Sequence, residues 1–109
     1  MDNLMKEVNW AFETGKQMRK AILGENAFSD KNEDDNAIRS FVYRLINLSS
    51  VGDTAQFMDT VLRQYSGYGL TIPAVFKNCY KSEEDFKAIA HGYILGLKYC
   101  NSKGENNNE

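Results

Sequence analysis

The first residues of this chain that could bind a ligand by charge are three cations at helical spacing. Arg19 and Lys20 follow Lys16 by three and four positions, so a helix would place all three on one face. Long cationic side chains can contact a phosphate backbone without reading its sequence. The alternative is a solvated helix surface with local ion pairs, which is the usual role of clustered charges.

A second group of polar residues accompanies an apolar stripe further along the chain. Arg39, Tyr43 and Arg44 lie near one another at the edge of that stripe, and they would offer two cations to phosphates and a ring to a stacked base. Arg63 stands four positions after Asp59, a spacing that predicts an ion pair within one helix. Spacing alone leaves two interpretations of Arg39 and Arg44, a phosphate contact or a solvated helix surface, and it favours a structural role for Arg63.

Side chains that could catalyse a reaction are few. His91 is the only histidine, and no nucleophile or carboxylate accompanies it at a recognisable spacing. Cys79 and Cys100 lack the spacing of a metal site, and the run Glu83-Glu84-Asp85 suits the first turn of a helix, where the dipole favours anions. The chain has no glycine-rich nucleotide loop. We predict that the protein is not an enzyme and binds no metal or cofactor; a rival enzyme would depend on His91 or Cys79.

Composition bounds the class of protein. The chain has 109 residues, of which 42% are hydrophobic and 26% charged, as in one small globular domain. The formal net charge is -2, but the acids concentrate in residues 25–36 and 101–109, so the rest of the chain is mildly basic. No apolar run approaches the roughly 18 residues of a membrane span, and residues 1–23 do not resemble a signal peptide. We expect a cytoplasmic protein that keeps its cysteines as thiols.

Apolar residues recur at helical steps of three and four in several segments. They predict helices over residues 2–23, about 35–49, from the cap Asp53 to the loop at 66–69, about 73–80, and after the cap Ser82. No segment alternates with the period of a strand. We expect an all-α, compact single-domain bundle of about five helices in residues 1–100, with a mobile acidic loop at about 25–36 and a disordered tail at 101–109.

Local signals mark the ends of these helices. Asp53 stands three positions before Gln56, and Ser82 stands three positions before Asp85, so each should accept a hydrogen bond from the first turn of its helix. Gly24 suits the left-handed conformation that often follows the end of a helix.

Small residues occupy every fourth position of the last predicted helix, at Ala88, Gly92 and Gly96. This spacing lets another backbone approach closely, which fits either packing inside the bundle or contact with another subunit. Trp10 flanks the apolar stripe of the first helix and is a further candidate for a partner. Trp10, Gly92 and Gly96 are therefore the predicted subunit interface.

A series of motifs across most of the chain resembles a known family. The motifs are Tyr43 to Asn47, Gly52-Asp53, Phe57 to Tyr65, Gly69 to Phe76, and Phe86 to Leu97. In this order they resemble the C-terminal helical region of the large subunit of type I-B CRISPR effector complexes (Cascade). The large N-terminal part of that subunit is absent, so the chain is similar to the separate small subunit, whether it arises from an internal translation start or from truncation.

The resemblance implies a role in an RNA-guided complex. Small subunits of this kind stack in more than one copy beside the backbone that carries the guide RNA, and they hold the target duplex open without catalysis. The implied partners are the backbone and large subunits of Cascade, further copies of the chain and the R-loop of guide RNA and target DNA, with no membrane and no small-molecule substrate. The expected phosphate contacts are Lys16, Arg19, Lys20, Arg39 and Arg44. The alternative is a helical protein-interaction or regulatory module with no nucleic-acid role.

Overall fold

The computed structural model describes residues 2–33, 35–78 and 82–100 of the chain. Its elements are the α-helices α1 (Asp2–Leu23), α2 (Asn36–Ser50), α3 (Thr54–Gly67) and α4 (Glu83–Leu97), and the short 3-10 turns η1 (Gly24–Asn26), η2 (Asp30–Asn32) and η3 (Ala74–Asn78). The prediction of an all-α fold is confirmed, since no strand occurs in these ranges. The short helix expected at residues 73–80 is the 3-10 helix η3 in its described part, so the described ranges hold four α-helices. Cys79 and the tail at 101–109 lie outside the described residues.

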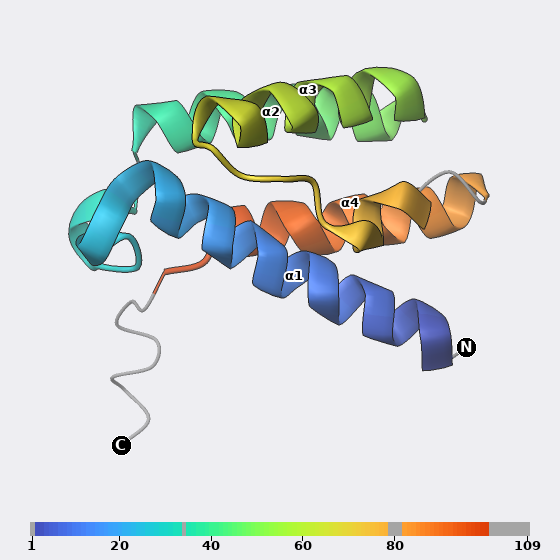
Figure 1. Cartoon of the computed structure of the whole chain (residues 1–109), viewed down its shortest axis with the longest axis horizontal. Coiled ribbons are helices and arrows are strands. Elements are labelled where there is room, and N and C mark those ends of the chain that lie inside the picture. The colour runs from blue at the N-terminus through green and yellow to red at the C-terminus, as the bar shows by residue number, and fades with distance from the viewer. Residues whose placement is uncertain (1, 34, 79–81, 101–109) are drawn as a thin grey trace.

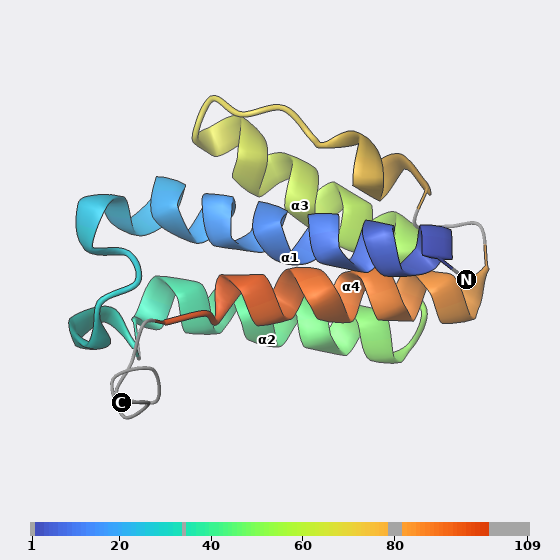
Figure 2. The ribbon, with the colours of Figure 1, turned by 90° about the horizontal axis from the view of Figure 1, so that it is seen from below.

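The four helices form two layers (Figure 1). α1 and α4 lie side by side and run in the same direction, and α2 and α3 form an antiparallel pair that covers one side of them (Figure 2). The segment after α3 runs back along the length of the bundle before α4 begins. The contact between α1 and α4 is the largest between any two elements, so this pair forms the centre of the fold. No helix in the described ranges has both the length and the apolar character to cross a membrane.

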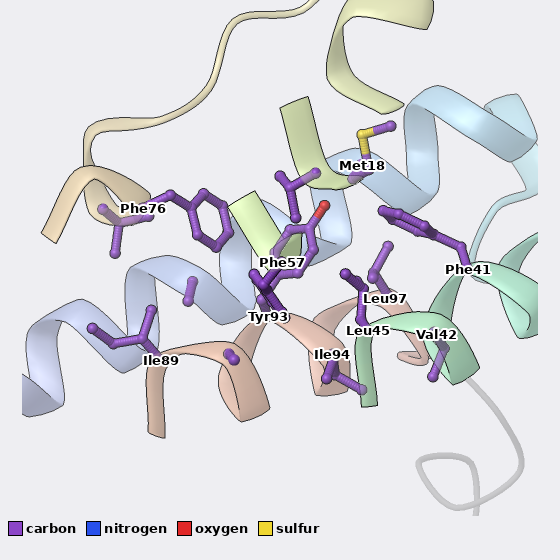
Figure 3. Packing of buried hydrophobic residues seen from close by; sticks show 14 of the residues in the cluster. Met18, Phe41, Val42, Leu45, Phe57, Phe76, Ile89, Tyr93, Ile94 and Leu97 are labelled. Atoms are coloured by element: carbon purple, nitrogen blue, oxygen red, sulfur yellow. The ribbon is translucent and has the colours of Figure 1, made fainter. Parts of the chain in front are cut away.

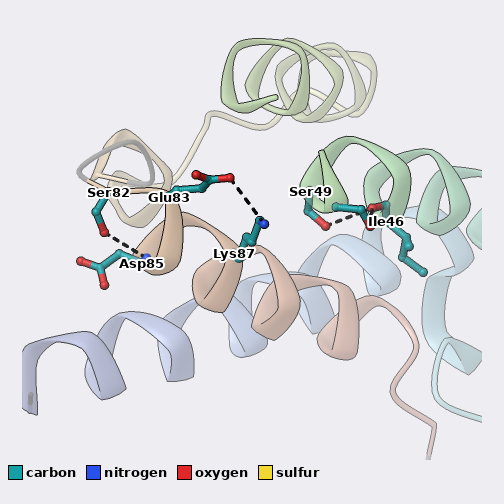
Figure 4. A network of polar contacts seen from close by, with 7 residues as sticks. Ile46, Ser49, Ser82, Glu83, Asp85 and Lys87 are labelled. Carbon is teal, nitrogen blue, oxygen red and sulfur yellow. Dashed lines mark hydrogen bonds and ion pairs between the residues drawn. The ribbon is translucent and has the colours of Figure 1, made fainter. Parts of the chain in front are cut away.

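The predicted caps are present. The Asp53 side chain accepts a hydrogen bond from the backbone N–H of Gln56 at 3.1 Å, and Ser82 Oγ accepts one from the N–H of Asp85 at 3.1 Å (Figure 4). Each satisfies a backbone donor that the first turn of a helix leaves without a partner. Gly24 adopts a φ of +83° after α1, as its position predicted. The ends of these helices are thus fixed by contacts within a few residues.

The core is built from apolar side chains of all four helices and η3 (Figure 3). Four fully buried or nearly buried aromatic residues meet edge to face within it. The rings of Phe57 and Phe86 are 5.3 Å apart, and those of Phe76 and Tyr93 are 4.7 Å apart. Such pairs add about 0.5–1.5 kcal/mol to the burial of their area. These residues belong to the family-like motifs, so the core accounts for much of what those motifs contain.

The glycines of α4 face α1 and not another subunit. A Cβ on Gly92 would lie 2.8 Å from the carbonyl oxygen of Val8, and one on Gly96 would collide with the carbonyl of Phe12. Gly15 of α1 faces the backbone of α4 in the same way. Both glycines of α4 are buried, so the prediction that Gly92 and Gly96 form a subunit interface is wrong. The alternative from the sequence, close packing inside the bundle, is what the structure has.

Candidate nucleic-acid interface

Arg19 is a buried structural residue. Its side chain is fully buried, and its guanidinium donates three hydrogen bonds to backbone carbonyl oxygens. Nε donates to Ala27 at 2.6 Å, Nη1 to Leu97 at 2.7 Å and Nη2 to Asn32 at 2.7 Å. A guanidinium held in this way cannot reach a phosphate, so the prediction that Arg19 contacts nucleic acid is wrong.

All three hydrogen bonds of the Arg19 guanidinium go to backbone carbonyl oxygens, and none of them goes to a carboxylate. Burial lowers the pKa of the guanidinium, and nearby Cys100, Asp35 and Glu33 partly offset that effect. The three carbonyl groups belong to the end of α4 and to the segment between α1 and α2. Arg19 therefore joins α1, the end of α4 and the acidic segment, which it contacts through two hydrogen bonds.

Lys16 is also engaged within the fold. Its Nζ lies 3.4 Å from a carboxylate oxygen of Glu13, and it stands over the rings of Phe12 and Tyr99, 4.9 and 4.8 Å from their centroids. The side chain is only 25% exposed. Among the three cations predicted to share a basic face, Lys20 alone is exposed, so α1 does not present the charged surface that its spacing indicated.

The exposed cations of the second predicted group lie on α2. Arg39 and Arg44 are exposed, and Tyr43 between them is 61% exposed. α2 contains no aspartate or glutamate, whereas α1, α3 and α4 all do. At 100° per residue, Arg39 and Arg44 fall on opposite edges of the exposed face, with Tyr43 between them. The structure thus places the three residues on one exposed face of α2, with Arg39 and Arg44 at its two edges and not side by side.

A shallow groove borders each edge of the exposed face of α2. The groove toward α4 is lined by Arg39, Tyr43 and Lys98, but also by the carboxylates of Glu33 and Asp35. The two acids balance the two accessible cations there. Asp35 is further fixed by its role as the cap of α2, since its carboxylate accepts from the first turn of that helix.

The groove toward α3 contains Arg44 and Arg63. Arg63 forms the predicted ion pair with Asp59, at 3.2 Å, and both side chains are well exposed, at 79% and 54%. An exposed pair of this kind contributes about 0.3–0.5 kcal/mol, so it orients Arg63 without removing it from solvent. Sequence reasoning assigned Arg63 to structure alone and missed that it shares a groove with Arg44.

Trp10 is the one predicted interface residue that remains accessible. It is 61% exposed on α1 and lines a groove with Pro73, Ala74 and Val75. His91 is exposed on α4. Among the described residues, no group of three or more histidines, cysteines or acids is arranged to hold a metal ion.

Comparisons of the chain with protein-family models, with curated proteins and with solved structures found no match. The proposed function therefore depends on the exposed residues Arg39, Tyr43 and Arg44 of α2 and on the motif resemblance.

Proposed function

We propose that this chain is a non-catalytic small subunit of a type I-B CRISPR RNA-guided surveillance complex. In this proposal it stabilises the R-loop by non-specific contacts to the nucleic-acid backbone and by packing on neighbouring subunits in the cytoplasm. One observation supports it most: the exposed face of α2 carries Arg39, Tyr43 and Arg44 and has no acid on its own helix. The ordered motifs between residues 43 and 97 support the assignment to this complex.

The mechanism requires only modest affinity. Exchange of a DNA duplex for an RNA–DNA heteroduplex is nearly balanced in free energy, so a few contacts to phosphates can favour the open state. A subunit that is already tethered in a complex binds at a high effective concentration, which compensates for weak intrinsic binding. With a net charge of -2, the isolated chain should bind nucleic acid weakly and without sequence preference.

The test is target-DNA binding by the remaining type I-B subunits, with and without this chain, at two salt concentrations. Adding the chain should tighten binding, and the double variant Arg39→Gln/Arg44→Gln should remove the gain and flatten the salt dependence. The matched control is Lys16→Gln/Lys20→Gln, which changes the charge of the chain by the same amount on α1. If the control removes the gain and the α2 variant keeps it, the interface is on α1 and the proposal for α2 is wrong.

A second candidate function rests on Trp10. An exposed tryptophan beside a groove lined by Pro73 and Val75 suits a protein-interaction or regulatory module with no nucleic-acid role. This candidate predicts that Trp10→Ala prevents association with a protein partner, whereas Arg39→Gln/Arg44→Gln has no effect. If the chain neither joins the CRISPR subunits nor changes their affinity for DNA, this second function is favoured.

A further inference from the structure

The groove between α2 and α3 brings together two arginines from different helices. Arg44 projects from α2 and Arg63 from α3, and the apolar side chains of Phe41 and Leu48 line the groove beside them. Phe41 is buried and Leu48 half-buried. The groove therefore has a cation from each of two helices and a partly apolar lining.

The other groove-lining side chains of α3 are polar. Gln56, Thr60 and Gln64 line it, and each can donate a hydrogen bond. Asp59 is the single carboxylate among the lining residues, and it is already paired with Arg63. This groove therefore has more hydrogen-bond donors than negative charges. The groove on the α4 side of α2 differs, because two carboxylates line it together with Arg39. An anionic ligand is the one that fits this groove.

We propose that the groove binds a phosphodiester of a nucleic-acid strand, with Arg44 and Arg63 donating to its oxygens from opposite walls. Asp59 is a positioning residue: it holds Arg63 over the groove when the groove is empty and competes with the phosphate for the guanidinium. The proposal rests on the proposed nucleic-acid role of α2 and extends that surface onto α3. It assigns a binding role to Arg63, which the sequence had indicated to be structural.

The neighbouring face of α2 favours nucleic acid over an acidic peptide. Tyr43 lies on the exposed face of α2 beyond the edge of this groove and is 61% exposed, so a neighbouring base of the same strand can stack on its ring. Arg39 stands on the other side of Tyr43, about 140° around the helix from Arg44, so the two cations flank the ring across the exposed face. A strand that crosses α2 can therefore meet a cation on each side of one stacked base. An acidic peptide would make no use of the ring.

The experiment measures binding of a short fluorescein-labelled oligothymidylate to the full chain by fluorescence anisotropy. Arg63→Gln should weaken binding about fivefold and lower the slope of log affinity against log salt by about one. Asp59→Asn should tighten binding about threefold at low salt, because the competing carboxylate is removed. In the double variant Asp59→Asn/Arg63→Gln little of that gain should remain, since Asp59 acts mainly through Arg63.

Glu13→Gln is the matched control for Asp59→Asn. Glu13 forms a comparable ion pair with Lys16 on α1, at 3.4 Å, and its side chain is 61% exposed. The substitution raises the net charge by the same amount, so an effect of overall charge would tighten binding equally in both variants. Equal tightening by Glu13→Gln and Asp59→Asn would overturn the proposal. Because these side chains are exposed, all of the variants should fold, and circular dichroism checks that they do.

The remaining outcomes separate this inference from the proposed function. If Arg39→Gln and Tyr43→Ala weaken binding but Arg63→Gln and Asp59→Asn leave it unchanged, the groove is not a phosphate site and the role of α2 stands. If none of these variants changes binding, both proposals fail. If fluorescein-labelled polyglutamate binds in an Arg63-dependent way and the oligothymidylate does not, the groove takes an acidic polypeptide and the nucleic-acid assignment is overturned.

Discussion

The guanidinium of Arg19 on α1 donates a 2.7 Å hydrogen bond to the carbonyl oxygen of Leu97, 78 residues later at the end of α4. The last carbonyl groups of a helix have no partner within the helix, and a cation at this end also interacts favourably with the negative end of the helix dipole. The same side chain binds the carbonyl groups of Ala27 and Asn32. One buried cation thus closes the parallel α1–α4 pair and fixes the segment that leads into α2.

Substitution of Arg19 should reduce stability strongly. Arg19→Ala leaves three carbonyl groups without their donor and opens a cavity, so we expect a loss of about 3 kcal/mol or more in the free energy of unfolding. Arg19→Lys keeps the charge but cannot reach three acceptors, and it should lie between alanine and the native protein. Urea unfolding measures both. The exposed neighbour gives the control, since Lys20→Ala should change stability by no more than about 0.5 kcal/mol; equal stability of the two alanine variants would contradict the role of Arg19.

The glycine contacts between α1 and α4 predict an unusual sensitivity to single methyl groups. Gly96→Ala places a Cβ against the carbonyl of Phe12, so the helices must separate, and we expect a net loss of about 2 kcal/mol despite the better helix propensity of alanine. Gly67, in the last turn of α3, has open space around its Cβ position and a φ outside the left-handed region. Gly67→Ala should therefore leave stability unchanged or raise it by up to about 1 kcal/mol. Thermal unfolding followed by circular dichroism compares them, and a neutral Gly96→Ala would show that the helices are not in such close contact.

The elements that the sequence predicted well are those governed by neighbours within a few residues. The caps Asp53 and Ser82 and the turn at Gly24 depend on local backbone geometry, and the apolar stripes repeat within each helix. The short helix expected at 73–80 is of the tighter 3-10 type in its described part, because so short a segment gains little from α-helical hydrogen bonding. This helix, η3, buries the side chains of Val75 and Phe76 in the core.

The candidate site was harder to predict because exposure depends on contacts across the whole chain. The spacing placed Arg19 on one face with Lys16 and Lys20. The carbonyl of Leu97, to which the buried Arg19 donates, lies on α4, which is far from α1 in the sequence although it packs against it. The spacing of four residues also predicted the ion pair between Arg63 and Asp59, which the structure confirms. The position of Arg63 beside Arg44 depends on how α2 and α3 pack together, and no local sequence pattern predicts that packing. A useful signal was present at α2, since among the α-helices of the described ranges it alone has no aspartate or glutamate.

The buried phenols of Tyr65 and Tyr93 predict a loss of stability at alkaline pH. Their rings are 6.4 Å apart, and both hydroxyl oxygens are fully buried. Burial raises the pKa of both phenols above the ordinary value of 10.0, and the proximity of Tyr65 raises that of Tyr93 further. Below about pH 10 both the folded and the unfolded chain keep these protons, so stability does not change. At higher pH the unfolded chain alone releases them, and the free energy of unfolding falls as pH rises.

Each phenol should contribute a slope of up to about 1.4 kcal/mol per pH unit above that point. Urea unfolding over a series of alkaline pH values measures the slope, and the variant Tyr65→Phe/Tyr93→Phe isolates the tyrosines from the lysines, which also titrate there. At neutral pH the double variant should be about as stable as the native protein, because it removes both buried hydroxyls together and leaves neither one behind without the other. An equally steep alkaline loss in both proteins would show that other groups cause it.

The ring of Tyr43 should contribute to nucleic-acid binding by stacking and not through its hydroxyl. Tyr43→Ala should weaken binding of a single-stranded oligothymidylate by about 1–3 kcal/mol, the usual contribution of one base stacked on an aromatic side chain, whereas Tyr43→Phe should bind as the native protein does. Tyr68→Ala is the control, since Tyr68 is also exposed, at 42%, but lies beyond the end of α3.

A strand with abasic sites separates the contribution of base stacking on Tyr43 from that of charge. The native protein should bind it less tightly than the strand with bases, and Tyr43→Ala should bind the two strands nearly alike. If the difference between the strands persists in Tyr43→Ala, the bases stack elsewhere and the exposed face of α2 supplies only charge.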